Sequence, residues 1–184
     1  MIPGPENDSG MARLFFALWP DEGLSAELYR LGGQLQEHCG GRRMRAETLH
    51  MTLAFPGEVE QSRVTDVHAL ASLIETAPFD VNLMQTGFWR HNRIVWAAPA
   101  EMPQGLVDLA AVLQERLKAA GFKLDARPYR PHVSLLRNAQ CTPLPALAEA
   151  LHWPVRDFVL ARSVKAGNVP AYQLIGRWPL LLRS

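Results

Sequence analysis

The order of apolar and polar positions along the chain predicts alternating strands and helices. Ala12 to Trp19 forms a short apolar run closed by Pro20, which is typical of a buried strand. Leucines then recur at helical spacing until Cys39-Gly40-Gly41 ends the helix; they are Leu24, Leu28, Leu31 and Leu35. The chain therefore begins with a strand followed by a helix.

The same patterns predict the remaining elements. In order, they are a strand over 49–55 ended by Pro56-Gly57, a helix with Val64, Val67, Ala71 and Ile74 on its apolar face, strands over 79–98 around a turn at 90–93, a helix from Pro103 to Gly121, a strand over 131–137, a proline-rich connection over 142–154, and two strands in the last thirty residues.

Strand, helix, strand, helix thus occurs twice, once before and once after about residue 90. This repetition predicts an α+β protein with a duplicated bilobal fold. We expect residues 1–10 to be a disordered tail, because they are polar and rich in turn residues, and residues 11–184 to form a single bilobal domain.

Composition and charge exclude several classes of protein. The formal net charge is only +1, whereas proteins that hold long nucleic acids carry a pronounced basic excess. Cys39 and Cys141 are the only cysteines and lie far apart in the sequence, so neither a disulfide framework nor a cysteine metal site is expected. We find no transmembrane segment or signal peptide, and we expect a reducing, cytoplasmic compartment.

A short motif occurs once in each half of the chain. It reads His50-Met51-Thr52-Leu53 in the first half and His132-Val133-Ser134-Leu135 in the second, each within a predicted strand. Because side chains alternate along a strand, histidine and hydroxyl share one face of each copy while the apolar residues anchor the other. Each strand is thus predicted to present a histidine and a hydroxyl to a cleft.

This pair of motifs suits the opening of a cyclic phosphodiester. The reaction requires a base that takes a proton from water and an acid that protonates the departing oxygen on the far side of phosphorus. Imidazole serves both purposes near neutral pH. The hydroxyls of Thr52 and Ser134 would hold the phosphate oxygens, and Arg137 would add charge, although strict alternation places it opposite Ser134 unless the chain bends.

Residues near the motifs are candidates for contacts with the nucleotide. Tyr129 and Arg130 precede the second motif, and Phe16 or Trp19 offers a ring for base stacking, although strand aromatics usually belong to the core. The basic cluster Arg42, Arg43 and Arg45 either guides a polyanion or forms a solvated loop.

The other four histidines lack a hydroxyl partner at the motif spacing. We expect His38 and His68 to be structural or solvated, and we assign no role to His91 or His152. No metal-binding motif is present, so no metal is expected.

On these segments the sequence resembles the 2H phosphoesterase superfamily, and within it the bacterial RNA 2',3'-cyclic phosphodiesterases, also known as 2'-5' RNA ligases. The resemblance extends from about Arg13 to Trp178 and rests on FFAL, LHMTLAFPGEV, the GFW and RIVWAA pair, and RPYRPHVSLLR. It weakens over 163–172, where Lys165 is the only cation although the family often has more basic residues there.

The resemblance implies two antiparallel sheets facing a central cleft, with helices packed outside. It implies that His50 donates a proton and His132 accepts one, that RNA 2',3'-cyclic ends become 2'-phosphates without a cofactor, and that 2'-5' ligation accompanies hydrolysis. Two alternatives remain: a phosphodiesterase for small cyclic nucleotides, and a module that binds terminal phosphates without catalysis. No membrane and no obligate protein partner are expected.

Overall fold

The computed structural model describes residues 10–125, 127–141, 144, 147–166 and 169–181. Its helices are α1 (Glu22–Cys39), α2 (Val64–Ser72) and α3 (Gln104–Ala119), with short 3-10 turns at Ala46–Thr48 and Gln61–Arg63. Its strands are β1 (Met11–Leu18), β2 (Arg42–Arg43), β3 (Met51–Glu60), β4 (Phe79–Trp89), β5 (Ile94–Pro99), β6 (Val133–Arg137), β7 (Leu151–Val155), β8 (Asp157–Ala166) and β9 (Val169–Pro179).

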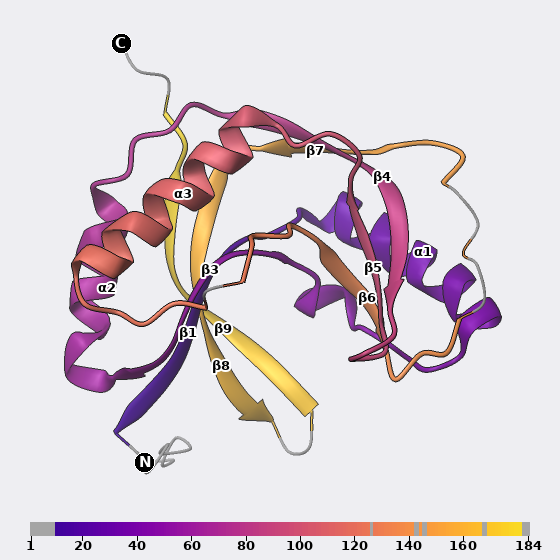
Figure 1. Ribbon diagram of the computed structural model, residues 1–184, viewed down its shortest axis with the longest axis horizontal. Coiled ribbons are helices and arrows are strands. Elements are labelled where there is room, and N and C mark those ends of the chain that lie inside the picture. Colours follow the sequence, from indigo (N-terminus) through magenta and orange to yellow (C-terminus); the bar gives the residue numbers. More distant parts are fainter. Residues whose placement is uncertain (1–9, 126, 142–143, 145–146, 167–168, 182–184) are drawn as a thin grey trace.

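All nine described strands belong to one antiparallel sheet, ordered β7-β4-β5-β6-β3-β1-β8-β9, with β2 paired to β6. The expected α+β class is confirmed. The sheet narrows at its middle, where β3 and β6 meet through the single pair Met51 and Val133. This seam divides the sheet into a first lobe, β3-β1-β8-β9, and a second lobe, β6-β5-β4-β7 with β2 (Figure 1).

The lobes do not follow the order of the sequence. The last two strands, β8 and β9, return to the first lobe, where β8 pairs with β1. Helix α1 packs on β6 and β7 of the second lobe, whereas α2 contacts β9 and α3 contacts β3 of the first (Figure 1). The predicted division near residue 90 is therefore wrong, because that position is the turn of the β4–β5 hairpin inside the second lobe.

Most predicted elements are confirmed, with two corrections to strand positions. The strand expected to end at Pro56-Gly57 continues to Glu60, because pairing with β1 resumes beyond an irregularity in the register. The connection predicted over 142–154 contains strand β7, which pairs with β4 and buries Trp153. Of the predicted tail, residues 1–9 lie outside the described residues, and Gly10 accepts a backbone hydrogen bond from Gln61.

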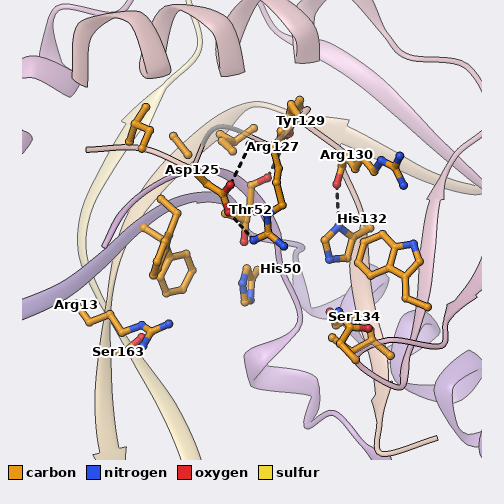
Figure 2. A pocket seen from close by; sticks show the side chains of 18 of the residues that line it. Arg13, His50, Thr52, Asp125, Arg127, Tyr129, Arg130, His132, Ser134 and Ser163 are labelled. Carbon is orange, nitrogen blue, oxygen red and sulfur yellow. Dashed lines mark hydrogen bonds and ion pairs between the residues drawn. The ribbon is translucent and has the colours of Figure 1, made fainter. Parts of the chain in front are cut away.

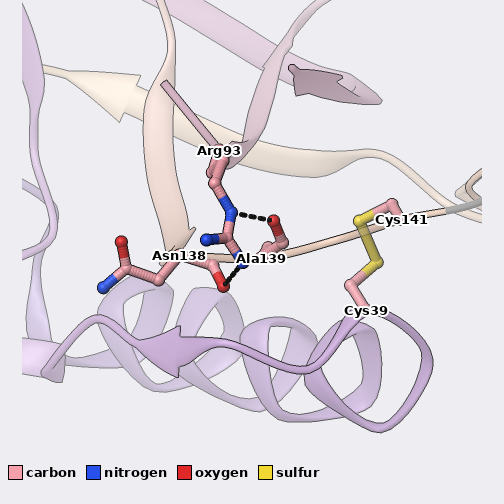
Figure 3. The surroundings of a disulfide bond; sticks show 5 residues. All are labelled: Cys39, Arg93, Asn138, Ala139 and Cys141. Carbon is pink, nitrogen blue, oxygen red and sulfur yellow. Dashed lines mark hydrogen bonds between the residues drawn. A yellow bond between two sulfur atoms is a disulfide. The ribbon is translucent and has the colours of Figure 1, made fainter. Parts of the chain in front are cut away.

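The two cysteines are also placed contrary to expectation. Cys39 at the end of α1 and Cys141 beyond β6 form a disulfide with their Cα atoms 4.5 Å apart (Figure 3). Arg93, in the β4–β5 turn, donates hydrogen bonds to the carbonyls of Asn138 and Ala139, at 3.1 and 3.2 Å. The segment after β6 is thus fixed from both sides. The sequence did not reveal the pairing because 102 residues separate the cysteines.

None of the described helices is long and apolar enough to cross a membrane.

Candidate active site

The two motif histidines begin the two strands that meet at the seam. His50 directly precedes β3 and His132 directly precedes β6, so each lies just outside the strand that was predicted to contain it. Both line one pocket of about 680 Å³ between the lobes. Figure 2 shows His50 and His132 near one another in this pocket, with Thr52 and Ser134 on their respective sides.

Each imidazole is held by the backbone two residues earlier. His50 Nδ1 lies 2.8 Å from the carbonyl oxygen of Thr48, and His132 Nδ1 lies 2.8 Å from that of Arg130. A carbonyl only accepts hydrogen bonds, so in both residues Nδ1 carries the proton and Nε2 is left for chemistry. The two motifs therefore share the side-chain arrangement as well as the sequence pattern.

The surroundings of the two rings differ. Three aromatic rings enclose His50: Trp19 stacks on it with centroids 5.3 Å apart and planes 7° apart, Phe15 lies at 4.8 Å, and Tyr172 meets it edge-on at 5.2 Å. His132 packs edge-on against Trp89, at 4.5 Å.

This enclosure affects the proton affinity of both rings. The pKa of His50 is lowered from 6.5 to about 4, mainly by burial; the hydrogen bond to the Thr48 carbonyl opposes this shift, and the nearby His132 and Arg137 contribute to it. Burial also lowers the pKa of His132, and Arg137 adds to that effect. Both rings are therefore neutral at pH 7 in the free protein.

Arg137 faces the pocket because β6 contains an irregularity. Ser134 is paired with Trp96, but Leu136, rather than Leu135, is paired with Val95. The extra residue at Leu135 reverses the alternation beyond it, so that Arg137 points to the same side as Ser134. Thr52, Ser134 and Arg137 all line the pocket with the two histidines.

The candidate nucleotide contacts separate into two groups. Tyr129 and Arg130 line the pocket. Tyr129 donates a hydrogen bond of 3.2 Å to the Thr52 carbonyl, and burial raises the pKa of the Tyr129 phenol. Phe16 is fully buried against Phe158, so its proposed contact with substrate is wrong. The ring that reaches the site from this strand is its neighbour, Phe15.

Strand alternation explains the error at Phe16. Arg13, Phe15 and Ala17 share one face of β1, and Leu14, Phe16 and Leu18 share the other, which is buried in the core. Arg13 was the signal in the sequence, because a charged residue two positions before Phe15 marks the face that meets solvent.

Sequence analysis missed several pocket residues. Trp89, the last residue of β4, and His91, in the β4–β5 turn, both line the pocket, as do Arg13, Ser163 and Tyr172 of the first lobe.

The basic cluster does not reach the pocket. Arg43 crosses α1, stacks on Tyr29 with its guanidinium 3.7 Å from the ring, and donates to the Tyr29 hydroxyl at 2.7 Å. Arg45 forms an ion pair with Glu47 at 3.2 Å. Arg43 therefore has a structural role on α1, and guidance of substrate by this cluster stays a prediction.

Three of the remaining histidines lie away from the pocket. His38 occupies the last turn of α1, His68 packs against Trp178 with centroids 4.7 Å apart, and His152 lies 3.7 Å from Asp80. Among the residues that the structure describes, no three or more of His, Cys, Asp and Glu are grouped to hold a metal ion.

Comparisons with known proteins identify the family of this chain. The sequence model of the 2'-5' RNA ligase superfamily matches residues 20–166 of this chain. An RNA 2',3'-cyclic phosphodiesterase of Escherichia coli is 31% identical over 169 residues, 91% of this chain and 96% of its own. One from Thermus thermophilus is 30% identical over 179 residues, 91% of this chain and 90% of its own. The crystal structure of E. coli LigT complexed with 3'-AMP matches with a TM-score of 0.86 and 30% identity, covering 94% of this chain and 99% of that one.

Proposed function

Because the chain belongs to the 2'-5' RNA ligase superfamily, we propose that it hydrolyses 2',3'-cyclic phosphates at RNA ends to 2'-phosphates, with two histidines as acid and base. Two relatives that match over most of their length are named RNA 2',3'-cyclic phosphodiesterases. The observation that carries the proposal is the pair of imidazoles, each held by its Nδ1 atom, that line one pocket between the lobes.

In the proposed reaction, His132 Nε2 takes a proton from water as the water oxygen bonds to phosphorus. The bond between phosphorus and the ribose 3'-oxygen breaks, and His50 Nε2 gives its proton to that oxygen. The product carries a 2'-phosphate and a free 3'-hydroxyl, and proton exchange with solvent restores both histidines. Thr52 and Ser134 donate hydrogen bonds to the non-bridging oxygens, where Arg137 stabilises the growing negative charge.

The pKa of His50 makes its role as proton donor dependent on substrate. With a pKa of about 4, the free side chain is neutral at pH 7. A phosphate anion between the rings favours the imidazolium, since an opposite charge within a few ångströms raises the pKa of a base. We infer that His50 acquires its proton as the cyclic phosphate binds.

The same residues would carry out 2'-5' ligation if a ribose 5'-hydroxyl of a second RNA replaced water as the nucleophile. The bond changes at phosphorus are the same, and the reverse reaction exchanges the roles of acid and base. The cytoplasmic location expected from the sequence stays a prediction, and the disulfide between Cys39 and Cys141 removes one of its grounds.

The proposal is tested with a nucleoside 2',3'-cyclic phosphate and a short RNA bearing that end, in the presence of a chelator. We expect a 2'-phosphate product from both. His50→Asn and His132→Asn should each lower the rate about 10²- to 10⁴-fold, whereas the matched variant His152→Asn, outside the pocket, should retain wild-type activity. Tight binding without turnover would leave only the binding module, and losses below about tenfold at both histidines would refute the acid and base roles.

A further inference from the structure

The pocket carries more positive charge than the whole chain does. Its described lining contains four arginines, Arg13, Arg127, Arg130 and Arg137, and one carboxylate, Asp125. Asp125 forms an ion pair with Arg127, which lowers the pKa of its carboxyl. The charge of Arg137 lowers the pKa of both histidines, and Arg130 lies two residues before His132 in the chain. Arg13 remains without a role in the proposed reaction.

Arg13 lies away from the reacting phosphate. Figure 2 shows Arg13 and Ser163 on the side of His50 that faces away from His132. Phe15, two residues after Arg13 on the same face of β1, packs against His50. Two residues of a strand span about 7 Å, so the backbone of Arg13 lies about that far along β1 from Phe15, which packs against His50.

Two neighbouring strands place polar groups beside Arg13. The pairing of β1 with β8 sets Leu14 opposite Arg162, and extending it by one residue sets Arg13 opposite Ser163. Ser163 is in turn paired with Tyr172 of β9. Arg13, Ser163 and Tyr172 therefore form a row across the first lobe, and all three line the pocket.

The guanidinium of Arg13 is positioned by an aromatic ring. It lies 5.1 Å from the ring centroid of Phe55, whose side chain is 37% exposed. Glu58 of β3 is opposite Arg13 in the strand register, but in the part of the chain that the structure describes the two side chains form no ion pair within 4.0 Å. Stacking on an aromatic ring uses the face of a guanidinium and leaves its N–H edges free, and this is the geometry that binds phosphate.

We propose that Arg13 and Ser163 form a second phosphate site, which binds the phosphoryl group on the 5'-oxygen of the nucleotide that carries the cyclic phosphate. This inference rests on the proposed function, since it takes the position of the cyclic phosphate from the histidine pair. The 5'-phosphoryl group belongs either to the RNA backbone or to a free nucleotide with a 5'-phosphate. Residues 163–172 contain only one cation, Lys165. The proposed site would hold the RNA beyond its terminal nucleoside in place of the basic residues that the family often has there.

The test compares three substrates: a nucleoside 2',3'-cyclic phosphate, the same compound with a 5'-phosphate, and a dinucleotide ending in the cyclic phosphate. We expect Arg13→Gln to lower kcat/KM about tenfold for the two substrates with a 5'-phosphoryl group, and less than about twofold for the first, on the scale of one charge-assisted hydrogen bond. Arg30→Gln makes the same change of charge at an exposed position of α1 outside the pocket, and should change none of these rates.

Salt dependence gives a second readout for the dinucleotide. Losing one phosphate contact should reduce the slope of log affinity against log salt by about 0.7 in Arg13→Gln, whereas Arg13→Lys should keep the slope. If only the dinucleotide has a higher kcat/KM than the nucleoside 2',3'-cyclic phosphate, RNA is the source of the phosphoryl group. If the 5'-phosphorylated nucleotide has an equally raised kcat/KM, the site also accepts small nucleotides. Equal losses on all three substrates, or no loss on any, would overturn the second site.

Failure of the proposed function would look different, because the wild type would then hydrolyse none of the three. Binding of adenosine 2'-monophosphate and adenosine 2',5'-bisphosphate still tests the site in that case. The bisphosphate should bind more tightly to the wild type and lose that advantage in Arg13→Gln. An equal affinity of the wild type for both would refute the inference independently of catalysis.

Discussion

Replacing His50 with asparagine should make the fold less sensitive to acid. Trp19, Phe15 and Tyr172 enclose the imidazole, and burial holds its pKa at about 4, compared with 6.5 in the unfolded chain. Between these values the unfolded state binds more protons than the native state, so stability falls as the pH falls. The contribution of His50 is fully present above pH 6.5 and is lost progressively down to about pH 4.

The size of the effect follows from the two pKa values. Each pKa unit is worth about 1.36 kcal/mol, so the full interval corresponds to about 3 kcal/mol. Between pH 7 and pH 5, where most carboxylates remain ionised, the loss due to His50 is about 2 kcal/mol. Asparagine does not titrate, and its amide N–H can still donate to the Thr48 carbonyl that His50 Nδ1 now contacts.

The measurement is urea unfolding at pH 7 and pH 5, followed by tryptophan fluorescence, for the wild type, His50→Asn and Thr52→Ala. The wild type and Thr52→Ala, which keeps both imidazoles, should lose about 2 kcal/mol more between the two pH values than His50→Asn does. Only the difference between pH values is compared, so the effect of each substitution at pH 7 cancels. If His50→Asn lost as much as the wild type, the enclosure of His50 would not control its protonation.

Two further predictions concern the pH profile of activity and the disulfide. The profile of kcat/KM for a nucleoside 2',3'-cyclic phosphate should be bell-shaped with both limbs below pH 6.5, because the reaction needs one proton on the histidine pair and both pKa values are lowered in the free protein. An alkaline limb above pH 6.5 would contradict this. Cys39→Ser should lower the free energy of unfolding by about 2 to 5 kcal/mol, as expected for opening a loop of 102 residues, and a reductant should have the same effect on the wild type but none on the variant.

The sequence by itself determined the local features of the protein. The leucine spacing of α1 and α3 and the apolar run of β1 depend on interactions between near neighbours, so they identified these elements directly. The two His-x-(Thr/Ser)-Leu motifs likewise placed each histidine and hydroxyl on one side of a strand, since alternation is a property of the strand alone. Together with the family resemblance, these motifs were enough to predict a two-histidine acid and base mechanism.

Only the tertiary structure decided which segments meet. The return of β8 to β1, the pairing of β7 with β4 and the contact between Cys39 and Cys141 join residues that lie far apart in the sequence, and their positions follow from closing the sheet and the core. Arg137 reaches the pocket because an extra residue in β6 changes the pairing with β5. Such irregularities depend on the partner strand, so the alternation of one strand cannot predict them.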